Sequence, residues 1–236
     1  GWIPFALKLK GLIKEGVALT DIAILFRTNQ QAEAIAGILQ EAKIPFMSNE
    51  KIQSCYNHWM LEDVKSFKRL TEDTWKKKDL SRVLNHPQRF LLGKDYLNCG
   101  LDMAKMRNVA SRIKVEWKRN NAYDEITSFF YLLRVLQGKK PFEFLSMMEK
   151  TGTYKKYLGE YAAFRNENVD DLMWIWDRYK KDASEHNNWT DWGRYIIGYN
   201  MKLEESQNQK DGVMLSTMHC SKGLEWKYVF IIDCVK

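Results

Sequence analysis

Two polar segments of this sequence follow short apolar runs and carry side chains suited to phosphate chemistry. The first is residues 26–29, FRTN, where Arg27 follows the apolar run Asp21–Phe26 with a permanent charge and a fork of donors. Such a guanidinium makes bidentate contacts to phosphate, and the alternative is a surface arginine paired with a glutamate. The second segment, residues 217–226, combines a hydroxyl, an imidazole, a cation, a glycine and a carboxylate: Thr217, His219, Lys222, Gly223 and Glu225.

The elements around the first segment predict a parallel sheet. Asp21–Phe26 is a nearly continuous apolar run, which is typical of a strand buried on both faces. Residues 31–42 carry one apolar helical stripe, and Thr28 or Asn29 is the candidate N-cap. Ile44–Met47 follows as a second strand, whose proline favours an edge position. A strand, a helix and a strand in this order form a βαβ unit with parallel strands.

The carboxyl-terminal residues repeat the strand pattern, and the middle of the chain is helical. Val213–Thr217 and Lys227–Asp233 are predicted strands. Helical patterns recur between the two parts, over Leu80–Leu84, Tyr96–Trp117, Asp124–Gln137, Pro141–Lys150, Val169–Asp182 and Trp189–Leu203. We therefore expect an α/β fold in which residues 1–70 and 211–236 form a parallel-sheet domain, interrupted by an all-α insertion domain over residues 71–210.

Composition and residue spacing argue against several classes of protein. The chain has 236 residues, 45% hydrophobic and 28% charged, which is typical of a folded globular protein. Its apolar runs are shorter than the roughly 18 residues of a membrane span, and its first residues lack a secretory signal pattern. The four cysteines form no CxxC pair, and the histidines have no metal-ligand spacing. We expect a cytoplasmic protein with no membrane partner and no metal site of its own.

A basic excess is compatible with a polyanionic partner. The formal net charge is +7, and the pI is about 9.1. The stretch Lys105–Arg119 concentrates this charge, with Glu116 as its one acid, and a solvated helix face is the alternative. Four tryptophans in predicted helices are expected to pack in a core rather than stack on bases: Trp174, Trp176, Trp189 and Trp192.

Three segments together resemble one protein family. Residues 213–231, VMLSTMHCSKGLEWKYVFI, closely resemble motif V of the UvrD/Rep/PcrA-type superfamily 1 DNA helicases. Residues 21–46 resemble the motif IV segment with its aromatic-Arg-Thr-Asn core. Asn85–Phe90, NHPQRF, is similar to the N-x-P-x-R stretch that opens the family's helical insertion. The resemblance implies a C-terminal helicase fragment, in which a RecA-like domain, 2A, is interrupted by a helical domain, 2B.

The resemblance implies roles at an ATP site between two RecA-like domains. Arg27 matches the arginine finger that reaches the γ-phosphate, a group worth roughly 10³–10⁵ in rate in other NTPases. Phe26 resembles the aromatic residue that contacts adenine, and the alternative is a core ring that closes the strand. Glu225 resembles the carboxylate that accepts from the ribose hydroxyl, and Gly223 permits a close approach or a positive φ. Arg27 and Glu225 are then expected at the same edge of the sheet.

The implied DNA contacts come from the same loop and from the insertion. Thr217 and His219 match the segment that touches single-stranded DNA, where both side chains can donate to a phosphate without reading a base. Lys222 either contacts phosphate or caps the loop. Arg89 matches the stretch by which domain 2B contacts duplex DNA, although FLLG replaces the family's GIG turn. Further candidates by charge alone are Lys94, Lys105, Arg107, Arg112, Lys114, Lys118 and Arg119.

Other parts of the family's ATP machinery are not found in the sequence. It has no GxxxxGK[ST] loop, and no acidic run follows an apolar strand as a magnesium site requires. The resemblance places these elements, and the ligands of the Mg²⁺ that accompanies ATP, on a missing N-terminal RecA-like domain. We therefore expect a fragment of an ATP-dependent 3′-to-5′ DNA helicase of repair or replication that binds single-stranded and duplex DNA and does not hydrolyse ATP alone.

Two other interpretations remain open. The chain could belong to a helicase–nuclease subunit of the AddA/RecB kind, which a nuclease motif elsewhere in that protein would decide. It could instead be a non-catalytic DNA-binding or protein-docking module built on the basic helices. That module predicts salt-dependent DNA binding without any effect of nucleotide.

Overall fold

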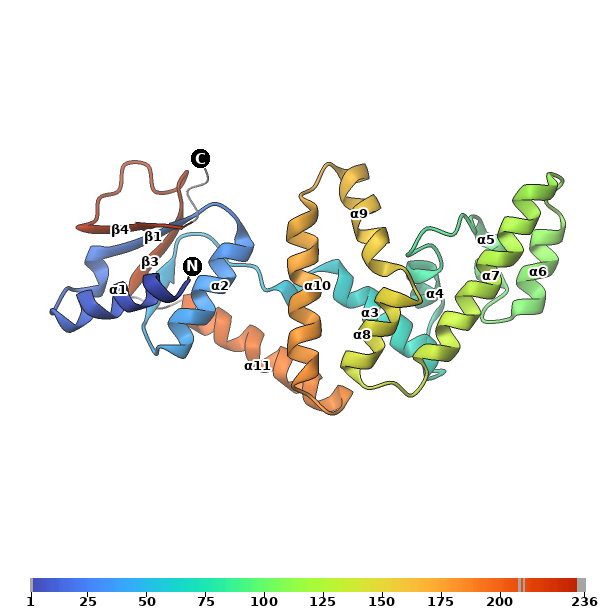
Figure 1. Cartoon of the computed structure of the whole chain (residues 1–236), viewed down its shortest axis with the longest axis horizontal. Coiled ribbons are helices and arrows are strands. Elements are labelled where there is room, and N and C mark those ends of the chain that lie inside the picture. The colour runs from blue at the N-terminus through green and yellow to red at the C-terminus, as the bar shows by residue number, and fades with distance from the viewer. Residues whose placement is uncertain (1, 208, 210, 233–236) are drawn as a thin grey trace. The chain divides into compact units, whose positions relative to one another are not determined.

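The computed structural model describes residues 2–207, 209 and 211–232, without the side chains of residues 2–6, and the chain forms two compact units (Figure 1). The first unit combines Gly1–Asn57 with Arg194–Lys236, and the second is His58–Gly193. These bounds differ from the division expected after residues 70 and 210. The identity of the units as domains 2A and 2B stays a prediction.

The two units differ in their secondary structure. The first contains α1 (Trp2–Lys14), the 3₁₀ helix η1 (Leu19–Asp21), β1 (Ile22–Phe26), α2 (Asn29–Glu41), β2 (Phe46–Ser48), the 3₁₀ helix η2 (Cys55–Asn57), β3 (Val213–Thr217) and β4 (Tyr228–Ile231). The second contains α3 (Trp59–Thr71), α4 (Lys77–Val83), α5 (Lys94–Asn98), α6 (Met103–Ser111), α7 (Glu116–Leu136), α8 (Pro141–Lys150), α9 (Tyr154–Arg165) and α10 (Val169–Ser184). Helix α11 (Trp189–Gln207) begins in the second unit and ends in the first.

The strands of the first unit form a parallel sheet in the order β2-β3-β1-β4. The predicted parallel sheet is therefore confirmed, and β3 has the bounds expected from its apolar run. Strand β2 begins after Pro45 and lies at the edge that this proline favours. Strand β4 begins at Tyr228, and the last residue of the strand expected there, Asp233, lies outside the described residues.

An apolar cluster holds helices against this sheet. Ile24 of β1, Leu39 of α2 and Leu215 of β3 are completely buried and belong to the same cluster. Gly212 lets β3 begin close beside β2, because a Cβ at this position would lie 2.6 Å from the carbonyl oxygen of Pro45. The sequence pattern of two-sided apolar strands and a one-sided helix thus produces the observed layers (Figure 1).

Every element within residues 58–193 is a helix, and most follow the predicted patterns. The single helix expected over Tyr96–Trp117 is wrong, because this stretch contains α5, α6 and the start of α7. Gly100 interrupts it with a φ of +63°, and the Asp102 side chain then caps α6 by accepting from the Lys105 backbone N–H at 3.0 Å. Helices α3 and α9 were not among the helices expected from the sequence.

The second unit is organised around a fully buried carboxylate. Asp63 of α3 accepts hydrogen bonds from Tyr154 at 2.8 Å and Arg82 at 3.2 Å, and it bonds to Nδ1 of His86 at 2.9 Å. These partners compensate the cost of burying its charge. Trp176 and Trp192 are also buried, which confirms core packing for two of the four tryptophans. None of the described helices is both long and apolar enough to cross a membrane.

Candidate functional site

The carboxyl edge of the sheet brings together segments that are distant in the sequence. Strand β1 ends at Phe26, which pairs in register with Thr217, the last residue of β3. The neighbouring strand β2 ends at Ser48. The residues that follow these strands therefore leave the sheet at the same end, which is where open parallel sheets bind their ligands.

Arg27 projects from this edge on a rigid support. Its backbone N–H donates to Oε1 of Gln31 at 2.8 Å. The next residue, Thr28, is the N-cap of α2 and forms a capping box with Gln31. Thr28 was one of the two N-cap candidates expected from the sequence. The Arg27 side chain is exposed and makes no hydrogen bond or ion pair with the described residues. The guanidinium is thus available to an external anion, whereas its backbone is fixed.

Phe26 has a different environment from the one that the resemblance implied. Its side chain is only 4% exposed and belongs to the apolar cluster beneath the sheet edge. A ring packed in this way offers no free face to an adenine. The structure therefore corrects the cofactor-binding assignment and supports the alternative, a core ring that closes β1.

The segment after β3 folds into a tight turn. The Ser221 N–H donates to the Thr217 carbonyl at 3.0 Å, and the Cys220 N–H donates to the Thr217 hydroxyl at 3.2 Å. This turn presents the side chains of His219 and Lys222 to solvent, and neither makes a hydrogen bond with the described residues. Two donors that the sequence assigned to phosphate contact are therefore exposed close to Thr217.

Glu50 is the residue of this edge that sequence reasoning missed. Its Oε2 accepts a hydrogen bond from the Thr217 N–H at 3.1 Å. Hydrogen bonds from the Thr217 side chain and backbone and from Cys220, together with the charge of His219, hold the pKa of Glu50 below its usual value. The available signal was an acid two residues past the end of β2, at the same sheet edge as the other segments.

Gly223 and Glu225 lie on the path from β3 to β4. Gly223 has a φ of +81°, which confirms that the loop needs a residue tolerant of left-handed backbone. Because β4 is parallel to β3, the chain must return toward the amino end of the sheet, where Tyr228 pairs with Ile22. Glu225 is exposed on this return segment. It forms no hydrogen bond or ion pair with Arg27, so no such interaction joins the two residues at one edge of the sheet. Their shared nucleotide role stays a prediction.

Arg89 is not the exposed DNA ligand that the sequence suggested. Its side chain is 5% exposed, and its Nη1 donates to the carbonyl oxygens of Val83, Leu84 and Pro87 at 3.0–3.2 Å. Burial lowers its pKa to about 10, which leaves the guanidinium charged at neutral pH. All of these partners are internal, so Arg89 ties a loop to α4 and is removed from the DNA-binding set.

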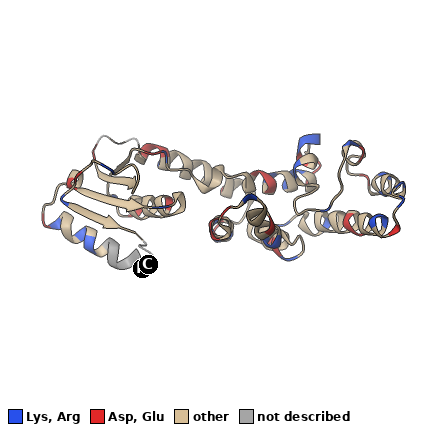
Figure 2. Ribbon diagram, turned by 90° about the horizontal axis from the view of Figure 1, so that it is seen from above, with Lys and Arg blue, Asp and Glu red and all other residues tan. Residues whose placement is uncertain are grey.

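The other basic candidates of the second unit remain on the surface. Figure 2 shows lysine and arginine positions mixed with acidic positions along the ribbon of both units, rather than gathered on one element. Six of the seven candidates are exposed and Arg119 is half-buried, donating to the Ile113 carbonyl at 3.1 Å. Their exposure permits contact with phosphates. Because they do not form one patch, they do not define how a DNA duplex would be positioned on the second unit.

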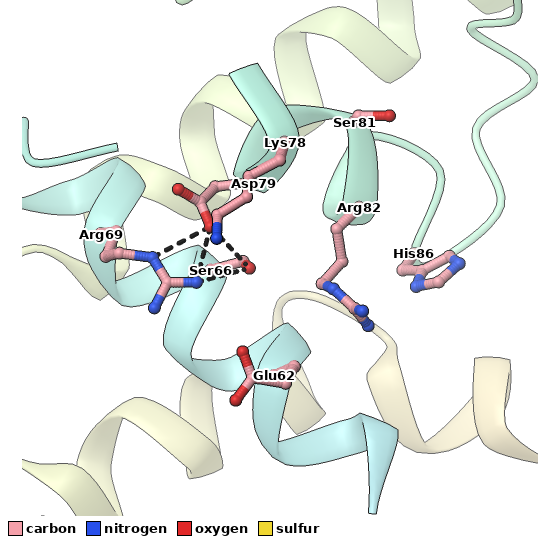
Figure 3. A pocket seen from close by; sticks show the side chains of 8 residues that line it. All are labelled: Glu62, Ser66, Arg69, Lys78, Asp79, Ser81, Arg82 and His86. Carbon is pink, nitrogen blue, oxygen red and sulfur yellow. Dashed lines mark hydrogen bonds and ion pairs between the residues drawn. The ribbon is translucent and has the colours of Figure 1, made fainter. Parts of the chain in front are cut away.

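A cavity of about 480 Å³ lies between α3 and α4 in the second unit (Figure 3). Its two arginines already have acidic partners. Arg69 reaches Asp79 at 2.6 Å, and Arg82 reaches Asp63 at 3.2 Å. Both carboxylates are buried, so the cations neutralise internal charge and we assign the cavity no ligand. In the described part of the chain, no group of three or more His, Cys, Asp or Glu side chains could hold a metal ion.

The chain is similar in sequence to several ATP-dependent DNA helicases. The chain is 26% identical over 233 residues to YjcD of Bacillus subtilis, covering 96% of this chain and 30% of the relative. It is 24% identical to the ATP-dependent DNA helicase PcrA of Staphylococcus epidermidis, covering 93% and 31%. It is also 24% identical to the ATP-dependent DNA helicase Rep of Salmonella typhimurium, covering 90% and 34%. The chain thus spans about a third of the length of these relatives.

A family model extends this similarity to almost every residue. The model of the UvrD-like helicase C-terminal domain matches residues 4–236, which include both structural units and all the segments described at the sheet edge. The chain belongs to the UvrD-like helicase C-terminal domain family.

Proposed function

We propose that this chain is the C-terminal part of an ATP-dependent 3′-to-5′ DNA helicase and supplies half of an ATP site. The other half, with the phosphate loop and the ligands of Mg²⁺, would lie on an N-terminal RecA-like domain. The sheet-bearing first unit would be domain 2A and the helical second unit the inserted domain 2B. Family membership and the named relatives support this proposal, which concerns a protein about three times as long.

The observation that carries the proposal is the exposed Arg27 guanidinium on a fixed backbone. Arg27 leaves β1 at the ligand-binding edge, and its neighbours are fixed by the Thr28 capping box. A free guanidinium held in this way fits a phosphate group, because it offers two parallel donors without first breaking an internal ion pair. Phe26, by contrast, is too buried to contact the base.

The proposed catalytic role of Arg27 is stabilisation of charge on the transferred phosphoryl group. When the two RecA-like domains close on ATP, Arg27 reaches the γ-phosphate and neutralises the charge that develops there. Glu225 accepts from a ribose hydroxyl, and Gly223 allows the loop to turn toward the nucleotide. This chain offers no phosphate loop, so ATP hydrolysis requires the N-terminal domain.

The proposed DNA contacts lie one strand away from Arg27. His219, Lys222 and Thr217 hold the phosphates of single-stranded DNA at the end of β3. Phe26 and Thr217 are register partners on neighbouring strands. A movement of Arg27, which follows Phe26, therefore acts directly on the turn that begins at Thr217. Cycles of domain closing and opening then move the chain along one strand. The exposed basic residues of the second unit contact duplex DNA.

Complementation tests this proposal. The chain is fused to the N-terminal RecA-like part of the Staphylococcus epidermidis PcrA relative, and ATP hydrolysis is measured with and without oligo(dT). We expect hydrolysis that single-stranded DNA stimulates, which the N-terminal part alone does not show. A folded fusion that binds DNA with strong salt dependence but without any nucleotide effect would instead support the non-catalytic module.

A further inference from the structure

The turn proposed to hold a DNA phosphate already holds an anion from its own chain. Oε2 of Glu50 accepts from the Thr217 N–H at 3.1 Å, and this carboxylate lies close enough to the Thr217 and Cys220 side chains for them to lower its pKa. Ser48 pairs with Leu215 at the end of the β2–β3 ladder, and continuing this register by two pairs puts Glu50 opposite Thr217, to which it is hydrogen-bonded. Its carboxylate takes the N–H that β2 would have bonded had the strand continued.

A carboxylate and a phosphate compete for such a site because their chemistry is alike. Both are anionic acceptors, and backbone N–H groups, hydroxyls and an imidazole serve either one. The Thr217 N–H cannot serve a phosphate while Glu50 keeps it. His219 acts on the same carboxylate through its charge. The Thr217 N–H, which would serve a phosphate, is therefore already engaged by Glu50, and the His219 charge lies near the same carboxylate.

We propose that Glu50 is an internal competitor that a phosphate of single-stranded DNA displaces from the 217–220 turn. The inference rests on the DNA contact proposed above for this turn. The Glu50 side chain is only partly buried, so it can swing into solvent. Its backbone stays in place meanwhile, because the Ser48 hydroxyl donates to the Glu50 carbonyl at 2.8 Å. Glu50 thus lowers DNA affinity and keeps the turn ordered when DNA is absent.

Substitution of Glu50 separates competition from simple support of the turn. Glu50→Gln removes the negative charge while it keeps the size of the side chain. We expect the whole chain to bind fluorescein-labelled oligo(dT) about three- to tenfold more tightly at low salt, the effect of removing one like charge near a phosphate. A positioning role alone predicts the opposite sign, since a loosened turn binds more weakly.

Glu41→Gln is the matched control. Glu41 is exposed at the last turn of α2, which returns from the carboxyl edge toward the start of β2, and its loss changes the net charge by the same amount. We expect less than a twofold change in affinity for this variant. An equal gain in both variants would mean a general charge effect and would overturn the competitor assignment.

Three further outcomes are decisive. A folded Glu50→Gln variant whose affinity is unchanged or weaker would overturn the inference, with thermal unfolding as the check on folding. If Glu50→Gln does not fold, Glu50→Asp replaces it, because the shorter side chain frees the Thr217 N–H; a smaller gain is expected, and no gain contradicts the inference. Failure of the wild-type chain to bind oligo(dT) would instead refute the DNA contact itself.

Discussion

Phe26 and Thr217 face each other as the last register pair of the parallel strands β1 and β3. Between them lies almost the whole chain, including the entire helical unit. Their pairing brings Arg27 to the same end of the sheet as the 217–220 turn, with Glu50 of the β2 side as a third component. The proposed coupling between a nucleotide and a DNA strand depends on this adjacency.

Removal of the exposed imidazole should weaken binding to single-stranded DNA. His219→Ala is expected to lower affinity for oligo(dT) about three- to tenfold, because one donor to a phosphate is lost. The loss should be similar for mixed-sequence oligonucleotides, since a phosphate contact reads no base. Fluorescence anisotropy measures both, with His186→Ala in the second unit as the control. A loss confined to one sequence would contradict the phosphate assignment.

Arg89→Ala should destabilise the helical unit rather than reduce DNA binding directly. The substitution leaves the Val83, Leu84 and Pro87 carbonyls without their donor, at a cost of about 2–4 kcal/mol. Burial lowers the pKa of Arg89 to about 10, below its value in the unfolded chain, so desolvation of the charged guanidinium opposes folding by a constant amount at every pH well below 10. The loss should therefore be constant between about pH 6 and 9 in urea unfolding. A stable variant with weakened DNA binding would restore Arg89 as a DNA ligand.

Glu33 is a buried carboxylate of the first unit with a structural role. It is 1% exposed, accepts from the Cys55 N–H at 3.0 Å and from the Tyr199 hydroxyl at 2.7 Å, and so joins α2 to η2 and α11. Glu33→Gln should cost about 1–3 kcal/mol of unfolding free energy. Tyr199→Phe should cost less, and the two effects should be less than additive in the double variant. Full additivity would show that the hydrogen bond contributes no stability.

Glu50 should make the unfolding free energy of the first unit depend on pH in the acidic range. Hydrogen bonds from Thr217 hold its folded pKa below the usual 4.5, so the ionised form favours the folded state. The stabilisation from the ionised Glu50 is fully present above the pKa of Glu50 in the unfolded chain, and it is lost as the pH falls through the pKa of Glu50 in the folded chain. Wild type should exceed Glu50→Gln in unfolding free energy at about pH 6, and the difference should shrink below pH 4.5. A difference that is unchanged in acid would contradict the hydrogen-bond geometry.

Local patterns in the sequence predicted the part of the fold that depends on short apolar runs. Strands β1 and β3 stand out because both faces of each are buried, and Pro45 marks the edge because it cannot donate to a ladder. The Thr28 cap also follows from its local sequence. The long helix expected over Tyr96–Trp117 failed because a glycine and a capping aspartate outweighed the apolar periodicity.

The sequence predicted exposure correctly for candidate residues that directly follow strands. It missed residues whose environment depends on a contact with a distant part of the chain. Arg89 lies in a polar stretch and was expected at the surface, but its acceptors are carbonyl groups that only the folded α4 and its loop bring together. Glu50 lies in an unremarkable turn, and its partner Thr217 is distant in the sequence. Such pairings depend on strand order, which the sequence pattern does not specify.

Turnover of ATP by the Arg27→Ala variant tests the central proposal most directly. In the intact helicase, single-stranded DNA-stimulated ATP hydrolysis should fall by roughly 10³-fold or more, as for other arginine fingers, while nucleotide binding persists. Lys14→Ala, which removes an exposed cation of α1, should retain normal turnover. Undiminished hydrolysis by a folded Arg27→Ala enzyme would contradict the assignment of this sheet edge to the ATP site.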